Sequence, residues 1–203
     1  MKIVLAHALG RTPASFALLL WRLRRAGHKP ETFSYFAFAE RHDAMLERLV
    51  TRLRPLAKDG RPVGLIGHSF GGLLLRQALP MVPGLRVHHF VMLGVPNNPP
   101  RMAGVASGWR VWRAHAGEVG ERLADPKWFE SLPPVRVPYT VVAGTMGWRG
   151  RRSPFGDEPN DGILAVSETL VAPDDKPVEL RAIHAMLMNA RGATRLILDA
   201  FKV

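Results

Sequence analysis

The chain has 203 residues, of which 47% are hydrophobic and 22% are charged, a composition typical of one globular domain. These values exclude a disordered or fibrous chain, and no apolar run approaches the roughly 18 residues of a membrane span. The chain has no cysteine, which excludes disulfides, thiolate metal sites and cysteine nucleophiles. We therefore expect a single domain over residues 1–203.

The charge is unusual, because 28 Lys and Arg outnumber 17 Asp and Glu and give a net charge of +11. Such a surface attracts nucleic acid, anionic lipid or an anionic substrate. No run of five or more like charges occurs, however, and the pattern favours arginines spread over a solvated surface. We expect no nucleic-acid partner and a weak association with anionic surfaces at most. The apolar run after Met1 is too short for a signal peptide, so we expect the cytoplasm.

Short β-branched runs alternate with amphipathic helical patterns along the chain. The predicted strands are Ile3–Ala6, Thr32–Phe38, Val63–Ile66, Val87–Leu93, Tyr139–Ala143 and Val178–Ile183. The predicted helices are Pro13–Ala26, Arg41–Lys58, Gly72–Leu79 and one within Met186–Phe201. This alternation predicts an α/β fold with a six-stranded, mostly parallel sheet that is covered by helices on both faces.

The segment Val95–Pro138, after the fourth predicted strand, breaks this alternation. It is far longer than the dozen or so residues that a crossover needs, and prolines mark both of its ends. Within it, Trp109 and Trp112 begin a stripe of apolar residues at helical spacing. We interpret the segment as a helical insertion. Either it packs on the sheet with its aromatic residues in the core, or it caps a pocket that Trp109 and Trp112 line, and both can hold.

The most informative motif is Gly-His-Ser-Phe-Gly at residues 67–71, between a predicted strand and a predicted helix. A side chain presented at such a sharp turn needs small residues two positions away on either side. The N-terminus of the following helix offers N–H groups and positive potential to a developing oxyanion. The motif therefore predicts that Ser69 is a nucleophile, the alternative being a glycine-rich turn whose serine caps the helix.

A serine nucleophile needs a base and an orienting acid, in the chain order serine, acid, histidine for this turn. The histidines at a useful distance after Ser69 are His115, inside the insertion, and His184. His184 follows the last predicted strand, at the edge where open α/β sheets bind ligands, and is the favoured base. The loop after the fifth predicted strand offers three carboxylates, Asp157, Glu158 and Asp161. All three are close enough in the sequence to reach His184, so their positions alone do not show which is the acid.

Four motifs, in this order and spacing, resemble the α/β-hydrolase superfamily and, within it, small bacterial lipases and esterases. They are His7-Ala8-Leu9-Gly10-Arg11, the Gly-His-Ser-Phe-Gly motif, Asn160-Asp161-Gly162 and His184. The resemblance covers nearly the whole chain, although the insertion matches only loosely. It implies an α/β-hydrolase fold and a catalytic triad of Ser69, His184 and Asp161, with Asp157 in reserve as the acid.

The resemblance also implies an oxyanion hole made of the backbone N–H groups of Phe70 and Leu9. Here the chain departs from the family pattern, because Ala8 stands where the family has glycine. If that position requires a positive φ, alanine is strained there and the loop has a different shape. His7 is expected to hold the loop through hydrogen bonds.

The implied activity is hydrolysis of a small-molecule carboxylic ester through an acyl-enzyme, with no cofactor and no metal. An acyltransferase or a thioesterase would use the same triad. A basic protein that binds nucleic acid or an anionic surface is the alternative from another class, although the sequence contains no helix-turn-helix, RNP-type or zinc-ligand pattern.

Overall fold

The fold is seen in a computed structural model that describes residues 1–103 and 110–202, and side chains except those of residues 110–116. Within these residues, six strands form one sheet in the order β2-β1-β3-β4-β5-β6, and all neighbouring strands are parallel. The strands are β1 Lys2–Ala6, β2 Lys29–Phe33, β3 Val63–His68, β4 Val87–Leu93, β5 Tyr139–Gly144 and β6 Val178–Leu180. The predicted fold class is confirmed.

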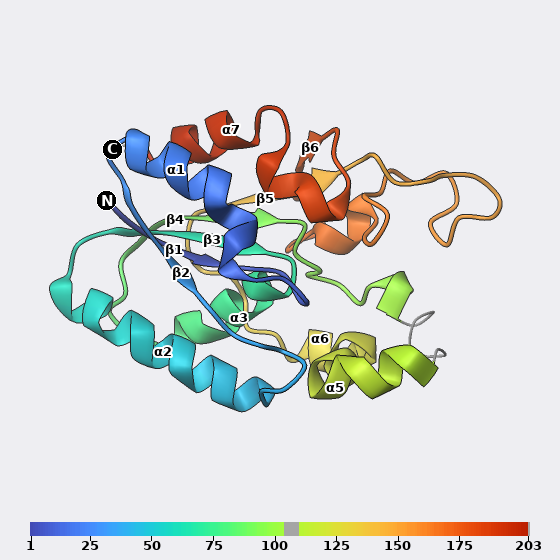
Figure 1. The fold of residues 1–203 in the computed structure, drawn as a ribbon, viewed down its shortest axis with the longest axis horizontal. Helices are drawn as coiled ribbons and strands as arrows, with labels where there is room; N and C mark the ends of the chain where they lie inside the picture. Colours follow the sequence, from blue (N-terminus) through green and yellow to red (C-terminus); the bar gives the residue numbers. More distant parts are fainter. Residues whose placement is uncertain (104–109, 203) are drawn as a thin grey trace.

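Helices cover both faces of the sheet (Figure 1). α1 and α7 lie on one face, and α2 and α3 lie on the other. The α-helices are α1 Ala17–Arg25, α2 His42–Asp59, α3 Phe70–Ala78, α5 Arg110–Ala124, α6 Pro126–Glu130 and α7 Ala193–Ala200. The 3₁₀ turns are η1 Pro13–Phe16, η2 Leu79–Met81, η3 Val166–Thr169 and η4 His184–Asn189. Both predicted layers of helices are therefore present.

The sheet separates two apolar cores. In β1, Ile3 and Leu5 belong to the core under α1 and α7, whereas Val4 and Ala6 belong to the core under α2 and α3. A strand that is buried on both faces needs apolar residues at every position. This explains why residues 3–6 of β1 and 63–67 of β3 are all apolar or glycine.

The predicted bounds of the second strand were wrong, because β2 covers Lys29–Phe33 and not Thr32–Phe38. The N–H of Lys29 donates to Met1, so the next residue, Pro30, faces the open edge, where its missing N–H disturbs no sheet hydrogen bond. After Phe33 the chain leaves the sheet and turns, and the N–H of Phe36 bonds the Glu40 carboxylate at 2.7 Å. The aromatic residues of this turn gave its sequence the composition of a strand. In the structure Tyr35 stacks on His7, and Phe36 packs against Phe38.

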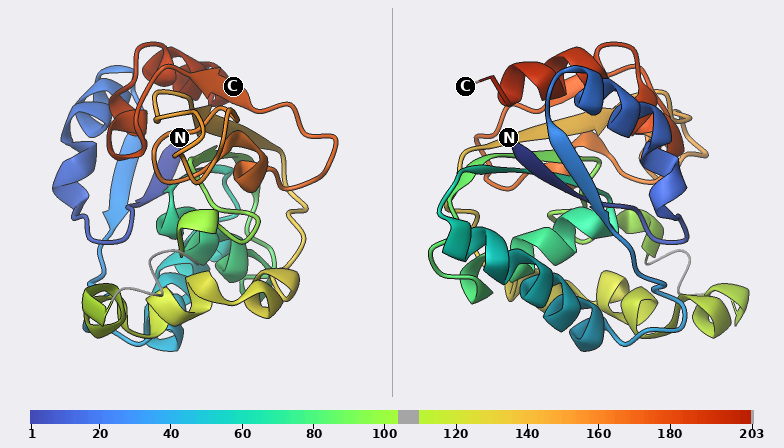
Figure 2. Two further views of the ribbon diagram at one scale, coloured as in Figure 1. Left: turned by 90° about the vertical axis from the view of Figure 1, so that its right-hand side faces the viewer. Right: turned by 60° about the vertical axis from the view of Figure 1, so that its left-hand side comes forward.

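The predicted insertion contains α5 and α6 (Figure 2). α5 is interrupted at Gly117, whose φ of 52° and ψ of −155° are not helical. Val119, Trp128 and Phe129 are buried in the core beside α2 and α3, as the core interpretation of the insertion predicts. Trp109 and the side chain of Trp112 lie outside the described residues, so a pocket wall made of them stays a prediction.

Within the described part of the chain, no helix has both the length and the apolar composition needed to cross a membrane.

Candidate active site

Ser69 occupies a strained turn between β3 and α3. Its φ of 53° and ψ of −127° make it the one non-glycine residue with positive φ among the described residues. The turn is held on both sides, because the Ser69 N–H donates to Leu93 at 2.9 Å and its carbonyl accepts from Gly72 at 2.9 Å. Strain of this kind persists only where the surroundings enforce it, and it marks functional sites.

The two glycines of the motif are required by close packing of the backbone. A Cβ on Gly67 would collide with the backbone of Gly72, and one on Gly71 would collide with the carbonyl groups of Ala6 and His7. These positions are thus crowded by backbone, which cannot move aside as a flexible side chain could. The small residues that the sequence predicts around Ser69 have this physical cause.

Asp161 and His184 form a buried pair. The Nδ1 of His184 lies 2.7 Å from the Oδ2 of Asp161, and Asp161 is 2% exposed. The Oδ1 of Asp161 accepts from the N–H groups of Ile163 at 2.9 Å and Leu164 at 2.7 Å, which fixes the carboxylate plane. Because a carboxylate only accepts hydrogen bonds, Nδ1 of His184 carries the proton and Nε2 is left with a lone pair.

The structure therefore brings Asp161, and not Asp157, to His184. Asp157 is exposed in the same loop, on the stretch between β5 and Asn160. Asp161 is placed by the backbone as well, since its carbonyl accepts from the N–H of His184 at 2.9 Å. The other histidine considered, His115, lies among the residues whose side chains are not described.

His68 is a second residue that contacts His184. Its Nε2 donates to the carbonyl of His184 at 3.0 Å, and the two rings lie 5.2 Å apart. Burial lowers the pKa of His68 well below its usual value, so the ring stays neutral beside His184. The peptide groups on both sides of the His184 side chain are thus hydrogen-bonded. Sequence reasoning assigned His68 no role, although its place beside Ser69 in the motif was the available signal.

The loop after β1 forms a tight turn from Ala8 to Arg11, closed by a 3.1 Å hydrogen bond from the N–H of Arg11 to the carbonyl of Ala8. The positive φ of this turn, 67°, falls on Gly10 and not on Ala8. The replacement of the family's glycine by Ala8 therefore introduces no positive-φ strain. Among the described residues, no backbone acceptor is found for the N–H of Leu9 or of Phe70. Leu9 lines the pocket described below, and an oxyanion hole made of the two N–H groups stays a prediction.

His7 stabilises the loop after β1 through its side chain. Its Nδ1 donates to the carbonyl of Ala8 at 3.0 Å, and its ring stacks on Tyr35 with centroids 4.2 Å apart. The Tyr35 hydroxyl donates in turn to the carbonyl of His7. Burial lowers the pKa of His7, which keeps the ring neutral, and these contacts agree with the structural role expected for it.

Ser69, His184 and Leu9 line one pocket of about 450 Å³. The pocket lies at the carboxyl ends of β1 and β3, which are neighbours in the sheet. The connection after β1 leads to β2 on one side, and the connection after β3 leads to β4 on the other, and such a point is the usual ligand site of open α/β sheets. Most of the remaining wall is apolar, and Phe38 and Ile163 contribute to it. Residues of the insertion segment complete it: Pro96, Pro100, Met102, Ala103 and Leu123.

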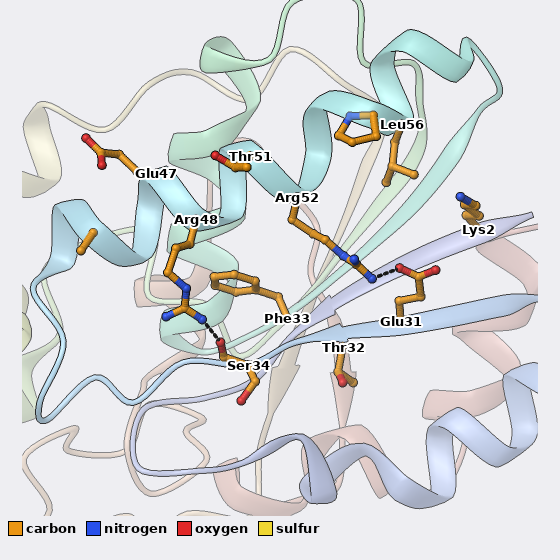
Figure 3. Close-up of a pocket in the computed structure, with 12 residues that line it drawn as sticks. Lys2, Glu31, Thr32, Phe33, Ser34, Glu47, Arg48, Thr51, Arg52 and Leu56 are labelled. Carbon is orange, nitrogen blue, oxygen red and sulfur yellow. Dashed lines mark hydrogen bonds and ion pairs between the residues drawn. The ribbon is translucent and has the colours of Figure 1, made fainter.

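A wider hollow of about 860 Å³ lies between β2 and α2 (Figure 3). Both arginines that line it are paired: Arg52 bonds Glu31, and Arg48 donates to the carbonyl of Ser34 at 2.7 Å. The described residues that line it include no histidine. The contacts of the two arginines attach α2 to the edge strand β2.

Within the described residues, no group of three or more His, Cys, Asp or Glu side chains is arranged to hold a metal ion.

A parallel sheet with a strained serine turn after β3 and an Asp–His pair beyond β5 and β6 defines the hydrolase class of α/β folds. The sequence model of the alpha/beta hydrolase family matches residues 3–200, and the chain belongs to this family. The resemblance predicted from the sequence is confirmed. No curated protein sequence matches the chain.

Solved structures similar to the chain include bacterial hydrolases. The Bacillus licheniformis lipase BlEst2 in mature form has a TM-score of 0.69 and 19% identity over 98% of this chain and 89% of that one. An extracellular alpha/beta-hydrolase from a Paenibacillus species has a TM-score of 0.61 and 16% identity over 98% of each chain. The Vlm2 thioesterase domain has a TM-score of 0.55 and 16% identity over 97% of this chain and 90% of that one. At these identities the likeness shows the fold alone.

Proposed function

We propose that the protein hydrolyses carboxylic esters through a triad of Ser69, His184 and Asp161. The observation that carries this proposal is the buried Asp161–His184 pair at 2.7 Å, whose His184 lines one pocket with the strained Ser69. A serine hydroxyl is a weak nucleophile, and an imidazole with its Nε2 lone pair free is the base that activates it. The family accounts for the hydrolase class, and the mostly apolar pocket favours an ester with an apolar acyl group.

The reaction follows from these positions. Nε2 of His184 takes the hydroxyl proton as Oγ of Ser69 attacks the ester carbonyl, and Asp161 stabilises the imidazolium that forms. The N–H groups of Phe70 and Leu9 donate to the oxyanion, and one well-placed donor of this kind is worth about 3–4 kcal/mol. His184 then protonates the departing alcohol, and a water activated by the same histidine releases the acid from Ser69.

The test uses p-nitrophenyl esters of rising acyl length, an acyl thioester, and an organophosphonate that reacts with activated serines. We expect turnover of the esters, and phosphonylation at Ser69 identified by peptide mass spectrometry. Preference for the thioester would make the protein a thioesterase, and product formation only with an added alcohol would make it an acyltransferase. If none of the substrates is turned over and Ser69 is not labelled, the proposal is wrong.

Phe38 is expected to contribute to acyl-chain binding, because its half-exposed ring lines the pocket. Replacing Phe38 with alanine should raise KM for a long-chain ester by roughly tenfold and leave KM for the acetate nearly unchanged, since only the long chain reaches this wall. Trp21 is the control, because it is an exposed aromatic residue on α1 that is not part of the pocket lining. Equal effects of Phe38→Ala on both esters would contradict this role.

A further inference from the structure

Large apolar side chains are exposed on the loops that follow β5 and β6. Trp148 is 61% exposed after β5, and Met146 beside it is also exposed. Ile183 and Met186 are exposed after β6, and Ile163, 46% exposed, contributes to the pocket that contains Ser69. Single exposed apolar residues are common, but several together beside a pocket mark an interaction surface.

Hydrogen bonds join these loops into one unit. The N–H of Met146 donates to Ala182 at 3.1 Å, and the N–H of Gly147 donates to Asn160 at 2.7 Å. The loop after β5 projects beyond the carboxyl ends of the strands, at the right of Figure 1, and it faces the viewer in the left view of Figure 2. The loops that carry the exposed apolar residues are thus joined to one another, and Ile163 on one of them lines the pocket.

The same surface is locally basic. Arg149, Arg151 and Arg152 directly follow Trp148, and all three are exposed. Two acidic residues of the same loop have partners elsewhere: Glu158 pairs with Arg101 at 2.6 Å, and Asp161 pairs with His184. The third, Asp157, is exposed and faces solvent near the end of the loop. Residues 146–152, which we name the Trp-Arg loop, therefore combine exposed apolar side chains with an excess of positive charge.

We propose that the Trp-Arg loop docks the protein on a bilayer that contains anionic phospholipid. Trp148 and Met146 would enter the interface, where amphipathic indole rings are favoured, and the three guanidinium groups would contact lipid phosphates. Docking there brings the pocket beside Ile163 to the membrane surface. The substrate class is then an ester of a membrane lipid, an assignment that rests on the proposed function, whereas the docking itself does not.

α1 provides a matched control for this surface. It also carries an exposed tryptophan, Trp21, followed by Arg22, Arg24 and Arg25. On α1, Arg25 lies over the Trp21 ring at 5.1 Å and Arg22 donates to Thr194 at 2.7 Å. In the Trp-Arg loop, by contrast, Arg149 has one long hydrogen bond, 3.4 Å, to the carbonyl of Thr145. None of these α1 residues lines the pocket, as far as the described residues show. The same number of arginines can therefore be removed from a place where we expect no docking.

The experiment measures vesicle binding of the Ser69→Ala protein, so that no lipid is hydrolysed. Vesicles of phosphatidylcholine, with or without about one third phosphatidylglycerol, are sedimented with the protein at low and high salt. We expect binding to the anionic vesicles that weakens with salt. The triple variant Arg149→Gln, Arg151→Gln, Arg152→Gln should lower the partition coefficient on the order of 100-fold. This is the combined effect of removing three basic residues that each contribute to binding near an anionic surface. The triple lysine variant at the same positions should restore binding.

The α1 triple variant, Arg22→Gln, Arg24→Gln, Arg25→Gln, should bind nearly as the parent does. Equal losses in the two triple variants would mean that net charge alone attracts the protein, and would overturn the docking site. Absence of binding to anionic vesicles, or binding to a DNA duplex in its place, would overturn it as well. Turnover of a soluble ester by the wild-type protein tests the proposed function separately, so the two proposals can fail independently.

Discussion

Replacing Ser69 with alanine should lower kcat for ester hydrolysis by about 10⁴–10⁶, because the alanine has no oxygen to form the acyl-enzyme. The fold should survive, since the strained turn is held by backbone hydrogen bonds to Leu93 and Gly72 and not by the hydroxyl. Alanine at this positive φ carries strain similar to that of serine. The measurement is steady-state turnover of a p-nitrophenyl ester, with a thermal melt to verify folding.

Ser34→Ala is the control for this variant. Ser34 is an exposed serine in the hollow between β2 and α2, and its backbone carbonyl, which the substitution keeps, accepts from Arg48. Its turnover should match that of the wild type. Ester turnover by the Ser69 variant within tenfold of the wild type would remove Ser69 from the mechanism.

Replacing Asp161 with asparagine should lower kcat by roughly 10⁴, through the tautomer of His184. The amide can keep its oxygen at the N–H groups of Ile163 and Leu164, which leaves its NH₂ group facing Nδ1 of His184. Nδ1 must then accept, so the proton moves to Nε2 and the lone pair that should activate Ser69 is lost. The loop hydrogen bonds stay intact, so stability should change little.

Asp157→Asn is the matched control, because it makes the same chemical change on an exposed residue four positions earlier in the same loop. It should leave kcat within about twofold of the wild type, since a solvated surface charge interacts weakly with the pocket. Both variants are compared in kcat and in thermal stability. The reverse order of losses would make Asp157 the acid, and equal large losses would mean that both carboxylates act.

Local sequence patterns were sufficient for most of the sheet. β1 and β3 are buried on both faces, so nearly all of their residues are apolar or glycine, and such strands are recognised without knowing their neighbours. β2 was misplaced because its bounds depend on pairing with β1 from Lys29 onward. The chain around Tyr35 has strand-like composition, but this aromatic residue packs on His7 and not in a sheet. Which partner a residue meets is a long-range property that no local pattern contains.

The sequence by itself determined the nucleophile motif, because the glycines beside Ser69 are a local requirement of a crowded turn. It also determined that His184 follows the last strand, where parallel strands deliver ligand-binding residues. Distance along the chain left both Asp157 and Asp161 within reach, and only the resemblance to a family favoured Asp161. The folded loop then places the Asp161 carboxylate against His184, a contact that no local pattern contains. Tertiary structure alone revealed His68, whose hydrogen bond to the carbonyl of His184 joins residues 116 positions apart. Such contacts join loops that are far apart in the sequence. They form only when the packing of the whole fold brings these loops together at the edge of the sheet.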